Sequence, residues 1–252
     1  MAADLPAPRD FEMKVAVVTP SIGNKHLRAC IESVQQQTYP NITHYIFLDG
    51  AEHFAAIRQV IDASARNKEI TTVALEKRIG GRGFYGHKVY ASCAFIVDAD
   101  LICFLDEDNF YRPEHVESLV RVISQNNLSW AYSLREIYDE SGAYLLRDDC
   151  ESLGRWQSFQ NRSVIDTSCY AVKKSVLLMM SPIWYGVAGT DAVFCKVIGV
   201  HHPDHRCTGL YTLGYRLGGT NSVPREHFER GNQQMLERYP NGLPWKALAP
   251  EA

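Results

Sequence analysis

Residues 15–37, VAVVTPSIGNKHLRACIESVQQQ, place a short β-branched run directly before an amphipathic segment. Residues 15–19 are of the kind that forms a strand buried on both faces. Over residues 25–37, apolar side chains recur three or four positions apart, at Leu27, Cys30, Ile31 and Val34. This spacing is typical of a helix with one buried face. The segment therefore predicts a strand followed by a helix.

The same alternation continues downstream of this unit. Further strands are predicted at 43–48, 70–75 and 101–105, and further helices at 54–65 and 88–97. Alternation of this kind predicts an α/β fold with a Rossmann-like, mostly parallel central sheet and helices on both faces. The second half is mixed: a hairpin at 128–148 turns at 140–142, and a strand at 165–172 and a helix at 191–200 follow. We expect one domain over residues 1–252.

The composition restricts the class of protein. With 252 residues, of which 46% are hydrophobic, the chain can bury a core without disulfides or a structural metal. A formal net charge of −3 argues against nucleic acid as a partner. No apolar run approaches the roughly 20 residues that span a bilayer, and the first residues do not resemble a signal peptide. We expect a cytoplasmic protein with no transmembrane segment, for which a peripheral membrane association stays open.

The cysteines agree with a reducing compartment. Seven are scattered singly, mostly in apolar segments, and none forms a CxxC pair: Cys30, Cys93, Cys103, Cys150, Cys169, Cys195 and Cys207. We expect them to be reduced and buried.

A run of carboxylates follows the strand at 101–105. Asp106, Glu107 and Asp108 come directly after it, and the carboxyl ends of parallel strands are where ligands bind in such sheets. Carboxylates at alternate positions can share a hard divalent cation, Mn²⁺ or Mg²⁺, with a diphosphate. The alternative is an acidic turn that caps a helix beginning near Pro113.

Several segments, in this order, resemble family 2 glycosyltransferases over residues 13–200. Residues 15–21 (VAVVTPS) are similar to the family's first strand, and residues 27–42 are similar to its helix and turn with the pattern SVLxQTYxNIE. The resemblance implies a GT-A fold with a nucleotide-sugar-binding half at 13–125 and an acceptor-binding half at 126–252. It also implies an inverting transfer from a nucleotide sugar, UDP-linked, to an acceptor hydroxyl of a glycan or a small molecule.

The resemblance extends to residues that would bind the donor. It implies that Thr19 and Pro20 border the base and that Asp49, which closes the strand before Gly50, contacts the uracil or the ribose. The family often has two aspartates where this chain has Leu48 and Asp49. An ordinary Asp-Gly turn is the alternative for Asp49.

The family's DxD motif matches the carboxylates after residue 105. The resemblance makes Asp106 and Asp108 metal ligands, with Asp108 the more direct, and places Asp106 and Glu107 beside the donor diphosphate. A glycine-rich loop at 80–83 lies where the family has a flexible loop. Here Gly81 would let the backbone approach phosphate, and Arg78 and Lys88 would neutralise it. A solvated surface loop is the alternative.

The sequence Gly189-Thr190-Asp191 resembles the motif in which the family's aspartate is the general base, although Thr190 stands where Glu is usual. Asp191 at a helix start could take the proton of the acceptor hydroxyl. The alternative is that Thr190 or Asp191 only caps the helix.

Four potential ligands are crowded into one short segment: His201, His202, His205 and Cys207. Their spacing is too compressed for a closed structural zinc site. Some related enzymes take a further metal ligand from a histidine after the base, and we assign that role to His202, with His201 and His205 as alternatives.

Two other functions compete with glycosyl transfer. A strand ending in Asp-x-Asp is also the nucleophile motif of haloacid dehalogenase-type phosphohydrolases, but there it follows the first strand and precedes Thr or Val. A catalytically silent module that binds a nucleotide sugar or a glycan would keep the fold without the chemistry.

Overall fold

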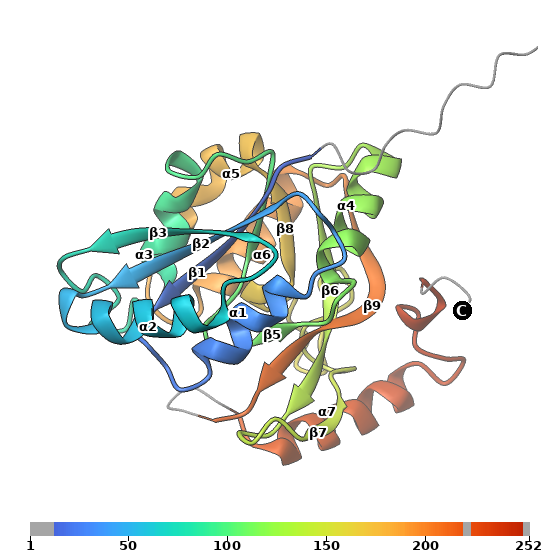
Figure 1. The fold of residues 1–252 in the computed structure, drawn as a ribbon. Helices are drawn as coiled ribbons and strands as arrows, with labels where there is room; N and C mark the ends of the chain where they lie inside the picture. The colour runs from blue at the N-terminus through green and yellow to red at the C-terminus, as the bar shows by residue number, and fades with distance from the viewer. Residues whose placement is uncertain (1–12, 219–222, 249–252) are drawn as a thin grey trace, which may run out of the picture.

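Strand β1 (Val15–Ser21) lies inside the parallel part of the sheet and is buried along almost its whole length. It pairs in parallel with β2 (Ile42–Asp49) on one side and with β4 (Leu101–Phe104) on the other, and β3 (Glu69–Leu75) completes this part beyond β2. The computed structural model describes residues 13–218 and 223–248 (Figure 1).

The sheet continues past β4 with mixed strand directions. Strand β8 (Tyr170–Lys173) runs antiparallel to β4, and β6 (Trp130–Tyr138) runs antiparallel to β8. Strand β9 (His205–Arg216) then lies parallel to β6, with β5 (Phe110–Tyr111) beyond it and β7 (Tyr144–Arg147) paired to β6. Within the described residues, one sheet therefore runs through both halves of the chain in the order β3-β2-β1-β4-β8-β6-β9-β5.

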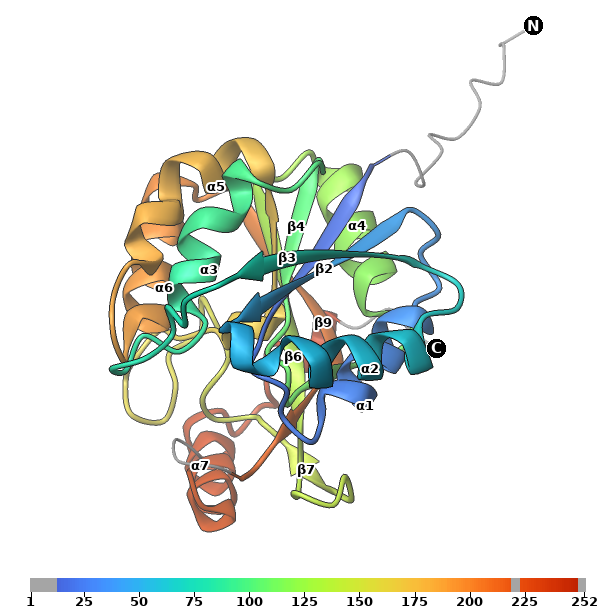
Figure 2. The ribbon, with the colours of Figure 1, turned by 60° about the vertical axis from the view of Figure 1, so that its left-hand side comes forward.

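Helices cover both faces of this sheet. Figure 2 shows α1 (Leu27–Gln35), α2 (Phe54–Ser64) and α4 (His115–Asn126) on one side, and α3 (His87–Ser92), α5 (Lys174–Met180) and α6 (Thr190–His201) on the other. Helices α1 and α2 bury apolar side chains together on β2, because those side chains recur at helical spacing: Leu27, Ile31, Ile57 and Ile61. The α/β fold class, with a parallel part and a mixed part, is confirmed.

The last helix lies apart from these layers. Helix α7 (Arg225–Arg238) packs on the segment that follows β7 (Figure 1). Its Gly231 allows this close approach, since a Cβ there would lie 2.6 Å from the sulfur of Cys150.

The first half follows the predicted elements closely, whereas the second half departs from them at β8 and β9 and contains two helices, α5 and α7, that the sequence does not predict. The strand predicted at 165–172 is shorter, because Asp166 accepts a hydrogen bond from the backbone N–H of Ser168 and caps a 3₁₀ turn (Thr167–Cys169) before β8 begins. Strand β9 was not predicted at all. The predicted helix at 88–97 ends as α-helix at Ser92 and continues as a 3₁₀ turn, Cys93–Phe95.

Two expectations about the whole chain can be compared with the structure. In residues 13–218 and 223–248, no helix is both long enough and apolar enough to cross a bilayer. All seven cysteines are buried and unpaired, as the sequence predicts.

Candidate active site

One edge of the sheet collects the acidic residues. Val18 pairs with Phe104, so Asp106 leaves β4 beside the end of β1. Strand β8 runs in the opposite direction, and the residues that precede it, Asp166 and Ser168, therefore arrive at this same edge. The turn before β8 thus joins the carboxylates that follow β4.

Asp106 is tied to both neighbouring elements. The hydroxyl of Tyr90 on α3 donates to Oδ1 at 2.6 Å, and the hydroxyl of Ser168 donates to Oδ2 at 3.4 Å and accepts from the Asp106 N–H at 3.1 Å. Burial raises the pKa of Asp106 to about 7, and the negative charges of Asp108 and Asp166 add to this effect. The carboxylate is oriented but not neutralised by a cationic side chain in the described part of the chain.

Asp108 shows the same electrostatic state. Its pKa is raised to about 6, chiefly by burial and also by the negative charges of Glu107 and Asp166, while Arg216 opposes them. The backbone N–H of Asp108 itself donates to this carboxylate and partly offsets the rise in its pKa. Asp108 also lines a cavity of about 360 Å³ between the loop after β1 and the end of β9.

Glu107 has a different task from the two aspartates beside it. Its carboxylate accepts hydrogen bonds from the Ser21 hydroxyl at 2.6 Å and from the backbone N–H groups of Ile22, Gly23 and Asn24 at 2.9–3.2 Å. These contacts fix the loop that follows β1. Its oxygens are therefore already engaged, and a contact to diphosphate remains only a proposal.

The two aspartates have the chemistry of a divalent-cation site. Both offer carboxylate oxygens, and their raised pKa values show that neighbouring groups do not compensate their charge. Within residues 13–218 and 223–248, no three Asp, Glu, His or Cys side chains are gathered closely enough to hold a metal by themselves. One or two carboxylates completed by substrate phosphates and water are an ordinary coordination for Mg²⁺, so the residues fit such an ion.

Asp191 lies in the first turn of α6, which begins after Gly189 at φ 86°. No side-chain capping hydrogen bond is formed at this helix start, and the Thr190 hydroxyl instead donates to the carbonyl of Val187. Asp191 lies near Asp166: burial raises the pKa of Asp166 despite the nearby Arg135, and the charge of Asp191 contributes to this shift. The base candidate therefore lies close enough to Asp166 to affect its pKa, and its place in the first turn also suits the helix dipole.

Arg135 on β6 was not identified from the sequence. Its side chain is 6% exposed, and its guanidinium donates to Asp148, Glu151 and Asp166 at 2.6–2.7 Å. The ring of Tyr215 lies 4.4 Å from it. Arg135 thus holds Asp166 in position. An arginine within a predicted strand is the one sign of this role in the sequence. The sequence does not show its three partners, because they come from other segments of the chain.

The residues expected at the nucleoside lie at the same edge. Asp49 accepts hydrogen bonds from the N–H groups of Ile79 and Gly80, at 2.6 and 2.8 Å, and so ties the loop after β3 to the end of β2. The Thr19 side chain is buried against His44, 2.9 Å away, so only the Thr19 backbone could border a base. Pro20 lies at the surface of this edge, in contact with the turn before α3.

The glycine-rich loop brings its predicted residues near this edge. Arg78 is exposed, and Gly81 has open space where a Cβ would stand. The Lys88 ammonium lies 3.8 Å from the centre of the Phe84 ring and 5.8 Å from that of Tyr185. These contacts are compatible with phosphate binding.

The histidine segment lies elsewhere, which corrects the assignment of His202 as a metal ligand. The carbonyl of His202 accepts from the Trp130 indole at 2.9 Å, just beyond the end of α6, whereas Asp191 is at its start. His205 is level with Ile102, at the beginning of β4, through Trp130 and Val172. The segment is therefore at the far end of the strands, about 13 Å along β4 from Asp106.

Comparisons with known proteins place the chain among transferases. The family described as glycosyl transferase family 2 matches residues 17–183. Crystal structures of S. aureus TarS 1–349, alone and with UDP-GlcNAc, are similar, with TM-scores of 0.61 and 0.63 and identities of 12% and 11%. They cover 91% of this chain and 72–73% of theirs. A third, in complex with UDP, has a TM-score of 0.62 at 12% identity, covering 91% of this chain and 72% of that one.

At such identities the likeness concerns the fold, which is of the GT-A type. No curated protein matches this chain. The family match spans well over half of the residues and includes both the strand that carries Asp106 and the turn that carries Asp166. The chain is a glycosyltransferase and belongs to glycosyl transferase family 2.

Proposed function

We propose that this glycosyltransferase moves a sugar from a UDP-sugar to an acceptor hydroxyl with inversion at the anomeric carbon, in glycan or polysaccharide biosynthesis. The observation that carries the proposal is the group of carboxylates at one sheet edge: Asp106, Asp108, Asp166 and Asp191. Such a group suits a reaction with a cation-bound diphosphate on one side and a proton to remove on the other.

The donor assignment rests on two supports. Family membership implies an activated sugar, and the similar TarS structures are described with UDP-GlcNAc and with UDP. In this chain, Asp49 fixes the loop after β3 and keeps further acceptor capacity for ribose or base. We assign the nucleoside contact to Asp49 and the backbone of Thr19 and Pro20, and the diphosphate contact to the loop with Arg78, Gly81 and Lys88.

Asp191 would perform the proton transfer. As the acceptor oxygen forms its bond to the anomeric carbon, Asp191 accepts the hydroxyl proton, and the bond between that carbon and the diphosphate oxygen breaks. Attack from the face opposite the leaving group inverts the configuration. Asp106 and Asp108 would hold Mn²⁺ or Mg²⁺, which would supply charge stabilisation for the departing diphosphate.

Ligand-dependent thermal stability tests the donor and the metal together. UDP with Mn²⁺ should raise the melting temperature more than GDP with Mn²⁺, because a ligand that binds only the folded state stabilises it. A chelator, or Asp108→Ala, should remove most of this gain and abolish slow hydrolysis of the donor. Equal protection by UDP and GDP would refute the nucleoside assignment, and donor hydrolysis that survives chelation would refute the metal site.

The competing functions make different predictions in the same experiment. A silent binding module would show saturable binding of UDP-sugar without hydrolysis. The haloacid dehalogenase alternative is excluded by the family and by topology, because the Asp-x-Asp sequence follows β4 and not the first strand.

A further inference from the structure

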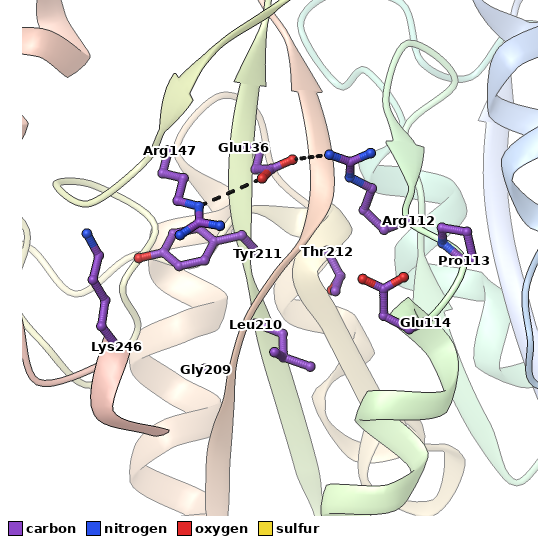
Figure 3. Close-up of a pocket in the computed structure, with 10 residues that line it drawn as sticks. All are labelled: Arg112, Pro113, Glu114, Glu136, Arg147, Gly209, Leu210, Tyr211, Thr212 and Lys246. Atoms are coloured by element: carbon purple, nitrogen blue, oxygen red, sulfur yellow. Dashed lines mark hydrogen bonds and ion pairs between the residues drawn. The ribbon is translucent and has the colours of Figure 1, made fainter. Parts of the chain in front are cut away.

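A cavity of about 420 Å³ lies away from the carboxylate edge, over strand β9. Figure 3 shows Arg147 and Lys246 on one side of this strand and Arg112 and Glu114 on the other, with Leu210 between them. The walls thus carry charges of both signs around an apolar side chain. None of these residues belongs to the carboxylate site.

The cations of this groove are already compensated. Arg112 donates to Glu136 at 2.9 Å, and Arg147 forms an ion pair with the same carboxylate at 3.8 Å. Lys246 pairs with Asp149 at 2.8 Å. A guanidinium has five N–H donors and an ammonium has three, so each cation keeps unused donors, while Glu114 and Glu136 keep acceptor capacity.

This balance favours a neutral ligand that both donates and accepts hydrogen bonds. An anion would meet Glu114 and Glu136, and a cation would meet Arg112, Arg147 and Lys246. The hydroxyl groups of a saccharide can satisfy donors and acceptors together, and its C–H faces can lie on Leu210 and on the edge of Tyr211, whose ring face is 4.7 Å from the Arg147 guanidinium.

The groove and the catalytic carboxylates lie on opposite faces of β6. Successive side chains of a strand point to opposite faces, and Arg135 reaches Asp166 while its neighbour Glu136 reaches Arg112 and Arg147. A ligand in the groove would therefore not occupy the transfer site. A ligand in the groove could be part of the acceptor that reacts at the transfer site only if that acceptor were an extended molecule.

We propose that this groove is a secondary binding site for neutral sugar units of an extended acceptor glycan, remote from the hydroxyl that reacts. The proposal rests on the proposed function, because it concerns the acceptor of the transfer. It predicts binding that depends on shape and hydrogen bonds and only weakly on ionic strength.

The test uses the full chain saturated with UDP and Mn²⁺, so that the transfer site is occupied. The probes are neutral tetrasaccharides of β-1,4-linked glucose, β-1,4-linked N-acetylglucosamine and α-1,4-linked glucose, with tetragalacturonate and inorganic phosphate as anionic contrasts, titrated by NMR. Arg147→Ala removes one wall, and Leu210→Trp fills the groove without changing its charge. Arg121→Ala is the matched control, because Arg121 lies on the exposed side of α4 and, among the residues that the structure describes, forms its ion pair with Glu117.

At least one neutral tetrasaccharide should bind, and both groove variants should weaken it about fivefold or more. Arg121→Ala should bind it normally, and raising NaCl from about 50 to about 500 mM should change affinity little. Absence of neutral binding, binding that survives both variants, or salt-sensitive binding of the anions alone would overturn the proposal. Donor hydrolysis, measured separately on each variant, reports on the proposed function independently of these outcomes.

Discussion

Asp106 and Asp108 illustrate how function conflicts with stability at the scale of single residues. Each is surrounded by protein that raises its pKa, and neither has a cationic side chain as a hydrogen-bonding partner in the described residues. Their ionised forms therefore cost free energy of folding until a cation or a proton compensates them.

This cost can be measured with Asp106→Asn. The folded-state pKa of about 7 lies above the ordinary 3.8, so between these values the folded protein binds the proton more tightly than the unfolded chain, and stability falls as pH rises through this window. At pH 8 without metal, the variant should melt higher than the native protein, by about 2–4 °C for each kcal/mol recovered. The gain should shrink toward pH 4.

Asp98→Asn is the control for this experiment. Asp98 is exposed, and the hydrogen bond from Lys14 lowers its pKa, so its replacement should not raise the melting temperature at pH 8. Equal melting temperatures of the native protein and Asp106→Asn at pH 8 would show that the ionised Asp106 does not reduce the free energy of unfolding.

Asp191→Asn separates catalysis from capping. If Asp191 is the base, the variant should bind UDP normally and transfer about 100- to 10,000-fold more slowly. Asn keeps the size of Asp and much of its capping ability, so a purely structural role predicts nearly full activity. Near-native transfer, or a product with retained anomeric configuration, would reject the assignment and turn attention to Asp166.

At the scale of elements, the loop after β3 shows how the end of one strand organises the next segment. Asp49 binds the N–H groups of Ile79 and Gly80, and a Cβ on Gly80 would lie only 2.2 Å from the carbonyl oxygen of Tyr85 and 2.8 Å from Oδ2 of Asp49. The loop can reach β2 only because this position lacks a side chain.

Gly80→Ala should therefore displace the loop and weaken UDP binding about tenfold or more, without unfolding the protein, because one or more hydrogen bonds to Asp49 are lost. Gly199→Ala, in α6 and outside this loop, is the matched control, since a Cβ at this position would have no neighbouring atom within 4 Å and the same change should be tolerated. Thermal shift with UDP measures both. Equal UDP binding by the two variants would mean that the loop does not contact the donor.

What the sequence predicts at this scale depends on local signals. The strands and helices of residues 15–105 have clear periodicity and appear where expected. Strand β9 has no clear periodicity, because two glycines interrupt its pattern. Gly209, at φ 75°, lies next to an irregular pairing with β6, and the Phe110 ring packs against Gly214. Glycines that serve a bulge or a close approach weaken the strand signal.

The sequence predicts the candidate site only where the site residues follow a recognisable segment. Asp106, Asp108 and Asp191 follow recognisable segments, whereas the roles of Asp166 and Arg135 depend on tertiary pairing. Asp166 joins the group because β8 runs antiparallel to β4, a direction that no local pattern reveals. His202 was assigned from its position in the chain, which does not show at which end of α6 the chemistry lies.

At the scale of the whole molecule, the burial of all seven cysteines gives a test of the fold as a unit. Burial raises the pKa of thiols such as Cys103, to about 12, so they should resist modification in the folded state. A thiol reagent at pH 8 should label the native protein slowly and the denatured protein at all seven positions without prior reduction. Rapid native labelling, or a requirement for reductant, would contradict this arrangement.

The pairing of β4 with β8 has a consequence for how the chain is made. While the ribosome has released only the first 125 residues, β1 to β4 can pair, but the outer side of β4 has no partner, since its partner β8 ends at Lys173. Strands β6 and β9, which continue the sheet beyond β8, also lie after residue 125. The nascent chain therefore exposes an apolar strand edge until β8 has been translated. Through this edge it could pair with another nascent chain on the same polysome. The amino-terminal half expressed alone should accordingly aggregate or recruit chaperones.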